Sequence, residues 1–394
     1  MINLRQLFLS YQGQTSDSPL CIEIEKAESI YMYSPDGKRY TDMVSGVSVS
    51  NVGHCHPKVV EAVKEQVSKY MHLMVYGEFV QSPQALYASK LVSILPKSLS
   101  NVYFVNSGSE ANEGAIKLAK RYTGRTEVIG MKNAYHGSTH GVLSLIGDEY
   151  FKNAFRPLLP DVRSIEFNNF ENIEQITERT ACVIVEPLQG EAGAIKPEKG
   201  YLQALREKCT NTGTLLIFDE VQTGFGRLGE MFAFEKYGTV PDIITIAKGM
   251  GGGMPIGAFI SSKEIMDSLQ TNPVLGHITT FGGHPVSCAA GMASLEVILS
   301  EKLVPQVERK AALFRKYLKD ANIKEIRGEG LLMAVDLGEQ KRFSKFLKMS
   351  YEKGIVSDGF LFNNSSFRIA PPLIITEQQI EETCEVLRDI IKQV

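Results

Sequence analysis

The segment Asp242-Ile-Ile-Thr-Ile-Ala-Lys248 is a short apolar run that ends on a lysine, and Leu215-Leu-Ile-Phe-Asp219 is a similar run that ends on an aspartate. Such runs alternate along the chain with stretches of helical periodicity, and the other runs are residues 102–105, 127–130 and 181–185. This alternation predicts an α/β domain built on a mostly parallel sheet. Ligands of such sheets bind beyond the carboxyl ends of the strands, so Asp219 and Lys248 are predicted to lie in one site.

A third run is followed by Asn106-Ser107-Gly108-Ser109-Glu110, a turn that leads into a predicted helix. A helix N-terminus offers free N–H groups and a positive dipole end, which suit a phosphate group. The turn also fits an ordinary helix cap in which Ser107 or Ser109 is the capping residue. No GxxxxGK[ST] motif occurs, and the glycine cluster 249–253 does not have GxGxxG spacing, which argues against an NTPase or a dehydrogenase.

A lysine, a carboxylate and a phosphate-binding turn are together the groups that pyridoxal 5'-phosphate requires. The lysine bonds covalently to the cofactor, the acid keeps the pyridine nitrogen protonated, and the turn binds the phosphate. Taken singly, Lys248 is equally compatible with a solvated side chain, and Asp219 with a helix cap or a metal ligand.

Composition narrows the class of protein. The 394 residues, 43% of them hydrophobic, suffice for two or three domains of roughly 150 residues each. The net charge of -3 gives no basic surface for nucleic acid, and no apolar run reaches the roughly 18 residues that a membrane span needs. The six cysteines are scattered, and three adjacent residues such as His54-Cys55-His56 cannot easily converge on one ion, so no metal is expected. We expect a cytoplasmic protein without nucleic-acid or membrane partners.

The chain divides by pattern into residues 1–50, 51–295 and 296–394. The first part is predicted to contain a short amphipathic helix at its start and a hairpin that turns at residues 34–37. The last part is predicted to mix helices and strands. The remaining predicted elements are helices near residues 57–67, 285–299, 305–318 and 380–391 and strands near 331–337 and 367–369.

Seven segments of the sequence, in this order, resemble the class III aminotransferases, the family of ornithine, acetylornithine, 4-aminobutyrate and ω-amino acid aminotransferases. They begin at Asn106 (NSGSEANEGAIKLAK), Asn133 (NAYHGST), Glu186 (EPLQGEAG), Asp219 (DEVQTGFGRLG), Ala247 (AKGMGGGMPIGA), Thr279 (TTFGGHPVSCAA) and Arg368 (RIAPPL). The resemblance implies the fold type I architecture of pyridoxal-phosphate-dependent transferases. This fold has a large domain with a seven-stranded, mostly parallel sheet and a small α+β domain made from both termini. It also implies a homodimer with the active site at the subunit interface.

The resemblance assigns roles to individual residues. Lys248 would form the Schiff base with the cofactor and move the proton between substrate and cofactor, and Asp219 would pair with the ring nitrogen. Tyr135 would stack on the ring, Gln222 would bond to the ring hydroxyl, and Thr280 would contact the phosphate of the other subunit. The other cofactor contacts implied are Ser107, Gly108, Ser109, His136, Gly137, Glu186 and Val221.

The substrate residues are also implied by the resemblance. Arg368 would bind a substrate carboxylate, and Glu186 would pair with this arginine while an ω-amine donor is bound. Tyr76 and Val47 would complete the substrate site. Ser138 stands where members that use 2-oxoglutarate commonly have an arginine for the second carboxylate, unless a residue such as Arg156 supplies that charge.

The predicted function is therefore transfer of an amino group from an ω-amino acid or related amine to pyruvate or 2-oxoglutarate. His284 stands where asparagine is usual in the family, and Val47 stands where ornithine-specific members have a tyrosine, whereas Gln189-Gly190-Glu191 resembles the ornithine branch. An ornithine or acetylornithine aminotransferase that uses 2-oxoglutarate remains an alternative. An aminomutase or decarboxylase of the same fold, and a protein that keeps the fold without catalysis, are the others.

Overall fold

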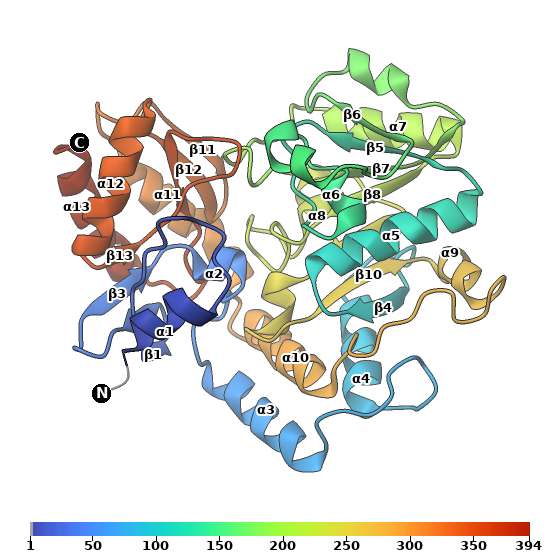
Figure 1. Ribbon diagram of the computed structural model, residues 1–394, viewed down its shortest axis with the longest axis horizontal. Coiled ribbons are helices and arrows are strands. Elements are labelled where there is room, and N and C mark those ends of the chain that lie inside the picture. Colours follow the sequence, from blue (N-terminus) through green and yellow to red (C-terminus); the bar gives the residue numbers. More distant parts are fainter. Residues whose placement is uncertain (1–2) are drawn as a thin grey trace.

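A computed structural model describes residues 3–394 and shows two lobes (Figure 1). The larger lobe is built around a seven-stranded sheet with the order β4-β10-β9-β8-β7-β5-β6. The smaller lobe combines the N-terminal elements, blue in Figure 1, with the C-terminal elements, orange to red. This is the predicted architecture, with both termini contributing to the small lobe.

The central sheet is parallel except at β10, which pairs antiparallel with both β4 and β9. All five predicted apolar runs are strands of this sheet. Two strands, β6 and β10, were not predicted, because β6 is a partly exposed edge strand and β10 follows directly on a glycine-rich segment. The strands are β4 (Asn101–Val105), β5 (Glu127–Met131), β6 (Val162–Ile165), β7 (Thr180–Val185), β8 (Leu215–Asp219), β9 (Ile243–Ile246) and β10 (Gly257–Ser261).

The helices agree with the periodicity of the sequence. Pro57, Ser107 and Pro285 mark helix starts as proline and N-cap residues do, and the predicted helices near 57, 285 and 380 are present. The helices of the large lobe are α3 (Pro57–Lys69), α4 (Ser82–Val92), α5 (Gly108–Thr123), α6 (His140–Leu143), α7 (Tyr201–Thr212), α8 (Ala233–Tyr237), α9 (Lys263–Asp267) and α10 (Pro285–Ser300). None of the helices within residues 3–394 is both long and apolar enough to cross a bilayer.

The small lobe has two sheets and five helices among the described residues. Strand β13 pairs in parallel with β3, which joins the two ends of the chain in one sheet of order β1-β2-β3-β13. Strands β2 and β3 form the predicted hairpin. The strands are β1 (Lys26–Glu28), β2 (Tyr31–Tyr33), β3 (Arg39–Asp42), β11 (Glu325–Glu329), β12 (Leu332–Asp336), β13 (Ile355–Val356) and β14 (Ser366–Ile369). The helices are α1 (Leu4–Tyr11), α2 (Ser45–Ser48), α11 (Val307–Tyr317), α12 (Gln340–Glu352) and α13 (Glu377–Ile391).

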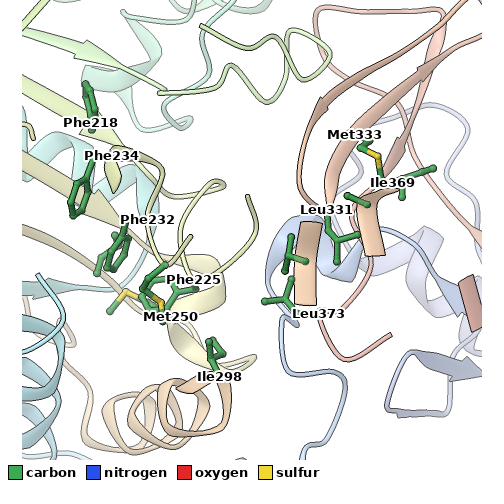
Figure 2. Close-up of a cluster of buried hydrophobic side chains, with 14 of the residues drawn as sticks. Phe218, Phe225, Phe232, Phe234, Met250, Ile298, Leu331, Met333, Ile369 and Leu373 are labelled. Carbon is green, nitrogen blue, oxygen red and sulfur yellow. The ribbon is translucent and has the colours of Figure 1, made fainter. Parts of the chain in front are cut away.

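We propose the division into residues 1–50, 51–295 and 296–394 because the shared sheet of β3 and β13 groups the first and third parts. The hydrophobic core nevertheless continues from one lobe to the other. One buried cluster includes Phe218, Phe225 and Met250 of the large lobe together with Leu331 and Leu373 of the small lobe (Figure 2). The lobes are therefore held together by packing as well as by the chain.

A buried cation lies at the junction of the lobes. The Arg227 guanidinium is fully buried and donates to the carbonyl oxygens of Leu331 and Pro371 and to the side-chain oxygen of Asn51. Asn51 in turn donates to the carbonyl oxygen of Phe225 at 3.0 Å. No carboxylate within residues 3–394 forms a salt bridge with Arg227, and burial lowers its pKa. Arg227 thus connects the second and third parts of the chain through neutral oxygen atoms.

We expect Arg227→Met to lower the melting temperature by about 5 °C or more. The substitution keeps an apolar stem of similar length but leaves three buried oxygens without a donor, each at a cost of about 1–3 kcal/mol. The measurement is thermal unfolding followed by circular dichroism. Arg309→Met is the matched control, because Arg309 is exposed and its ion pair with Glu377 contributes at most about 1 kcal/mol. A melting temperature within about 1 °C of wild type would contradict the role of Arg227.

Candidate active site

A cavity of about 680 Å³ lies at the carboxyl ends of the central strands. The residues that follow β4, β5, β7, β8 and β9 all contribute to its wall, as expected for a sheet of parallel strands. They are Asn106, Ser107, Gly108, Ser109, Tyr135, His136, Gly137, Ser138, Thr139, Glu186, Asp219, Val221, Gln222, Ala247 and Lys248, and Asn112, Val49 and residues 253–256 complete the wall.

Lys248 is the second residue after β9 and begins a short 3-10 helix, Lys248–Gly251, where the sequence predicted a loop. Its backbone has a φ of 48°, in the left-handed region that non-glycine residues rarely adopt. No hydrogen bond or ion pair of its ammonium group is found within residues 3–394. Burial lowers the pKa of Lys248, and the charge of Arg368 lowers it further. A lowered pKa makes the neutral amine, which is the nucleophilic form, more accessible.

Asp219 ends β8 and is 4% exposed. Its carboxylate accepts hydrogen bonds from Asn112 Nδ2 at 2.8 Å and from the backbone N–H of Val221 at 3.0 Å, and it bonds to His136 Nδ1 at 2.7 Å. Asn112 is itself oriented by Thr245, whose hydroxyl donates to Asn112 Oδ1 at 2.6 Å. These contacts fix the position of the Asp219 carboxylate at the edge of the cavity.

His136 borders the cavity, and its side chain bonds to Asp219. Its ring is fully buried, and its second nitrogen, Nε2, has no partner within residues 3–394. Burial lowers the pKa of His136, but the hydrogen bond to Asp219 and the charges of Asp219 and Glu186 outweigh burial, so the pKa is raised. The predicted cofactor contact of this residue stays a prediction, and the structure places its ring against the aspartate.

The neighbouring Glu220 faces away from the cavity. Its carboxylate accepts hydrogen bonds from the first N–H groups of α8, at Ala233 and Phe234, and from the Thr223 hydroxyl. Burial raises the pKa of Glu220 to about 7. Of the two adjacent acids, Asp219 is therefore the one that borders the cavity.

The turn before α5 combines both roles that the sequence left open. Ser107 caps α5, because its side chain accepts from the N–H of Glu110 at 3.1 Å. The first turn of the helix also faces the cavity through Gly108 and Ser109. A Cβ on Gly108 would lie 2.8 Å from Val221 Cγ1, and a Cβ on Gly137 would lie 2.3 Å from Ser109 Oγ. Glycine at both positions permits the close packing of the turn.

The pairing predicted between Glu186 and Arg368 is wrong. Glu186 accepts instead from the backbone N–H groups of Tyr135 at 3.0 Å and Gly190 at 2.8 Å, and burial raises its pKa to about 7. Arg368 Nη2 donates to the two carboxylate oxygens of Glu191 at 2.8 and 3.0 Å. The loop after β7 turns back at Gly190, so it is Glu191 that faces the arginine. The motif Gln189-Gly190-Glu191 was the signal in the sequence.

Gln222 connects this ion pair to the cavity. Its Oε1 accepts from Arg368 Nη1 at 3.1 Å, and its Nε2 donates to Glu191 Oε1 at 3.0 Å. The side chain that was predicted to bond to a cofactor hydroxyl therefore also orients Arg368 and Glu191. Asn112 and Thr245 are further residues that the sequence analysis missed, although Asn112 lies within one of the quoted motifs.

Besides Arg368, four residues named from the sequence lie outside the cavity wall. Tyr76 Oη and Thr280 Oγ1 are 3.4 Å apart on the surface, and Val47 lies in α2 while Val49 borders the cavity. Arg156 donates to Glu149 at 2.7 Å and is half exposed.

Ser138 does border the cavity, where its Oγ lies 3.0 Å from Tyr135 Oη. The position that carries an arginine in many members thus has only hydroxyl groups here.

Comparison with known proteins identifies the family of the chain. The sequence profile of the family described as "Aminotransferase class-III" matches residues 11–391. The acetylornithine aminotransferase of Methanopyrus kandleri is 39% identical over 99% of this chain and 99% of its own, and that of Archaeoglobus fulgidus is 40% identical over 93% and 94%. Among solved structures, the ornithine aminotransferase of Toxoplasma gondii ME49 superimposes with a TM-score of 0.92 at 29% identity, covering 99% of this chain and 94% of its own.

A transaminase from the marine bacterium Virgibacillus has a TM-score of 0.93 at 28% identity and covers 99% of this chain and 98% of its own. These matches confirm the predicted fold type I architecture and the dependence on pyridoxal 5'-phosphate. The chain belongs to the class III aminotransferases.

Proposed function

We propose that this aminotransferase takes the amino group from an ω-amino acid or a related amine and transfers it to pyruvate, with Arg368 as the binding site of the keto acid carboxylate. The observation that carries the proposal is the buried pair of Arg368 and Glu191 beside the Lys248 cavity. While Glu191 covers the arginine, an amine without a carboxylate near its reacting carbon can bind. When Glu191 moves aside, Arg368 offers two parallel donors to a carboxylate.

The residues of the cavity fit pyridoxal 5'-phosphate. The N-terminus of α5 at Gly108 and Ser109 would hold the phosphate, Asp219 the protonated ring nitrogen, and Lys248 the aldehyde carbon. Tyr135 and Val221 both border the cavity and would lie against the ring. When bound, the cofactor supplies a carbon that accepts the amino group and a ring that delocalises the electron pair of the substrate carbon.

The residues of the protein would orient the cofactor and transfer the protons. Asp219, fixed by Asn112 and His136, would place its carboxylate beside the ring nitrogen and would thereby favour a proton there. Lys248, with its lowered pKa, takes a proton from the substrate carbon and returns it on the other side of the reaction.

The acceptor follows from the charges around the cavity. A dicarboxylate such as 2-oxoglutarate would need a second cation, and Ser138 supplies none. Arg156 is paired with Glu149. Pyruvate, with one carboxylate, fits the residues that are present. The relatives named acetylornithine and ornithine aminotransferase favour a donor of the ornithine type as a second candidate.

A homodimer is the second part of the proposal. Large apolar side chains are exposed on two segments, residues 71–80 and 274–281. The two segments lie together, because His72 Nε2 donates to the carbonyl oxygen of Thr280 at 2.9 Å and the His72 ring packs on Phe281. The surface borders the cavity, since Asn106 Nδ2 donates to Thr279 Oγ1 at 3.1 Å. Contiguous exposed apolar surface marks a protein interface. We propose that a second copy covers it and brings the partner subunit's Thr280 to the cofactor phosphate.

The central test is Lys248→Ala. Turnover should fall by at least about a thousandfold, because the residue would supply both the covalent link and the proton transfer. Amino transfer is measured with pyruvate and a panel of amine donors. Borohydride reduction and peptide mass mapping should find the cofactor on Lys248 in the wild type and on no lysine of the variant. Lys263→Ala, at an exposed lysine of α9, is the control. Substantial turnover in the Lys248 variant would refute the assignment.

Ser138→Arg tests the acceptor. The wild type should use pyruvate at least as well as 2-oxoglutarate, and the variant should shift the ratio of kcat/KM toward 2-oxoglutarate by about tenfold to a hundredfold, since hydrogen bonds between charged groups contribute about 1.5–3 kcal/mol. Ser98→Arg adds the same charge at an exposed position and should leave the ratio unchanged. If the wild type strongly prefers 2-oxoglutarate and Ser138→Arg does not shift the ratio of kcat/KM, Ser138 does not determine the acceptor. Arg156 would then be the residue to test.

Val80→Asp tests the dimer. Val80 is 99% exposed in a single chain, so an aspartate there costs nothing unless a partner covers it. We expect light scattering after size exclusion to show a mass about half that of the wild type, and activity to fall with it. Val240→Asp, on the large lobe away from this surface, is the control. A wild-type chain that is monomeric and fully active would rule out the shared site.

A further inference from the structure

The guanidinium group of Arg368 forms ion pairs with two carboxylates. Besides Glu191, which contacts Nη2, the carboxylate of Asp358 accepts from Arg368 Nε at 2.9 Å. The Asp358 side chain is 38% exposed, whereas those of Arg368 and Glu191 are 2% and 8% exposed. The three charges sum to -1, so the arginine at the carboxylate site is already more than neutralised.

Most of the hydrogen-bonding capacity of Arg368 is also in use. A guanidinium has five N–H groups. Nη1 donates to Gln222 and Nη2 donates to the carbonyl oxygen of Gly359 at 3.0 Å, in addition to the two carboxylates. The ring of Phe360 covers one face at 4.5 Å. An incoming carboxylate therefore gains two parallel donors only by displacing Glu191.

Asp358, in contrast, is fixed by the backbone. The N–H of Arg368 donates to the carbonyl oxygen of Asp358 at 2.8 Å, which holds the two residues side by side whatever the side chains do. Glu191 lies on a separate loop after β7, where its side chain also contacts Gln222 and the N–H of Leu361 and its backbone carbonyl oxygen accepts from the N–H of Phe362 at 3.0 Å. None of these bonds ties the backbone of Glu191 to that of Arg368. When Glu191 leaves, Asp358 remains and repels the carboxylate that takes its place.

We propose that Asp358 is a specificity-determining residue that weakens carboxylate binding at Arg368 and so directs the enzyme toward amine donors that lack an α-carboxylate. The inference rests on the proposed role of Arg368. An α-amino acid must place its carboxylate at this arginine, as must the keto acid, whereas a simple primary amine need not. The repulsion raises KM for pyruvate, and it also speeds release of the alanine formed from it, which limits product inhibition.

The test is Asp358→Asn, which keeps an oxygen acceptor for Arg368 Nε and removes only the charge. The ratio of KM for pyruvate to KM for butylamine should fall about tenfold, equivalent to about 1.4 kcal/mol. The dissociation constant of propionate, a carboxylate that cannot react, should fall by a similar factor when followed by cofactor absorbance. Asp389→Asn, an exposed residue of α13 in the same lobe, makes the same charge change and should alter neither value.

An unchanged or weaker affinity for propionate in folded Asp358→Asn would overturn the inference. If that variant does not fold, Asp358→Ser offers a neutral oxygen at the same place and is subject to the same criterion. Arg368→Met separates the two proposals. Unchanged propionate affinity in this variant would refute Arg368 as the carboxylate site, whereas loss of affinity there with no gain in Asp358→Asn would refute the role of Asp358 alone.

Discussion

The burial of the Asp219 carboxylate is the constraint on which the site depends. A carboxylate that leaves water must be surrounded by donors, and here they come from three directions: from α5 through Asn112, from the segment after β5 through His136, and from its own turn. These bonds fix the start of α5 and the segment around Tyr135 relative to β8. The contacts that stabilise the Asp219 carboxylate thus also fix the segments that form the wall of the cavity, which Lys248 borders as well.

Much of this arrangement could be predicted from the sequence because of how central parallel strands are buried. Leu215–Phe218 and Ile243–Ile246 are covered on both faces, so they appear as unbroken apolar runs, and the residues that end them necessarily meet at one edge. Strand β10 was not predicted, because it begins with a glycine after a glycine-rich segment and its pairing is antiparallel. Its existence depends on long-range pairing with β4 and β9, which no local pattern reveals.

The site was predicted in its chemistry and only partly in its geometry. Glu186 was assigned as the partner of Arg368 from the resemblance of its motif, yet the loop that follows reverses direction and places Glu191 there instead. No sequence pattern pointed to Asp358, because its proposed role depends on a backbone hydrogen bond to Arg368 across the loop between β13 and β14. Residues whose role depends on the path of a loop are the ones that sequence patterns describe least well.

The sheet of order β1-β2-β3-β13 has a consequence for the synthesis of the chain. Strand β3 ends at Asp42, but its parallel partner begins only at Ile355. At a translation rate of about 5–20 residues per second, the N-terminal strands emerge from the ribosome roughly 15–60 s before that partner exists. During this interval the large lobe can assemble while the first strands present an unpaired edge, which leaves them open to capture by a chaperone or by a neighbouring nascent chain.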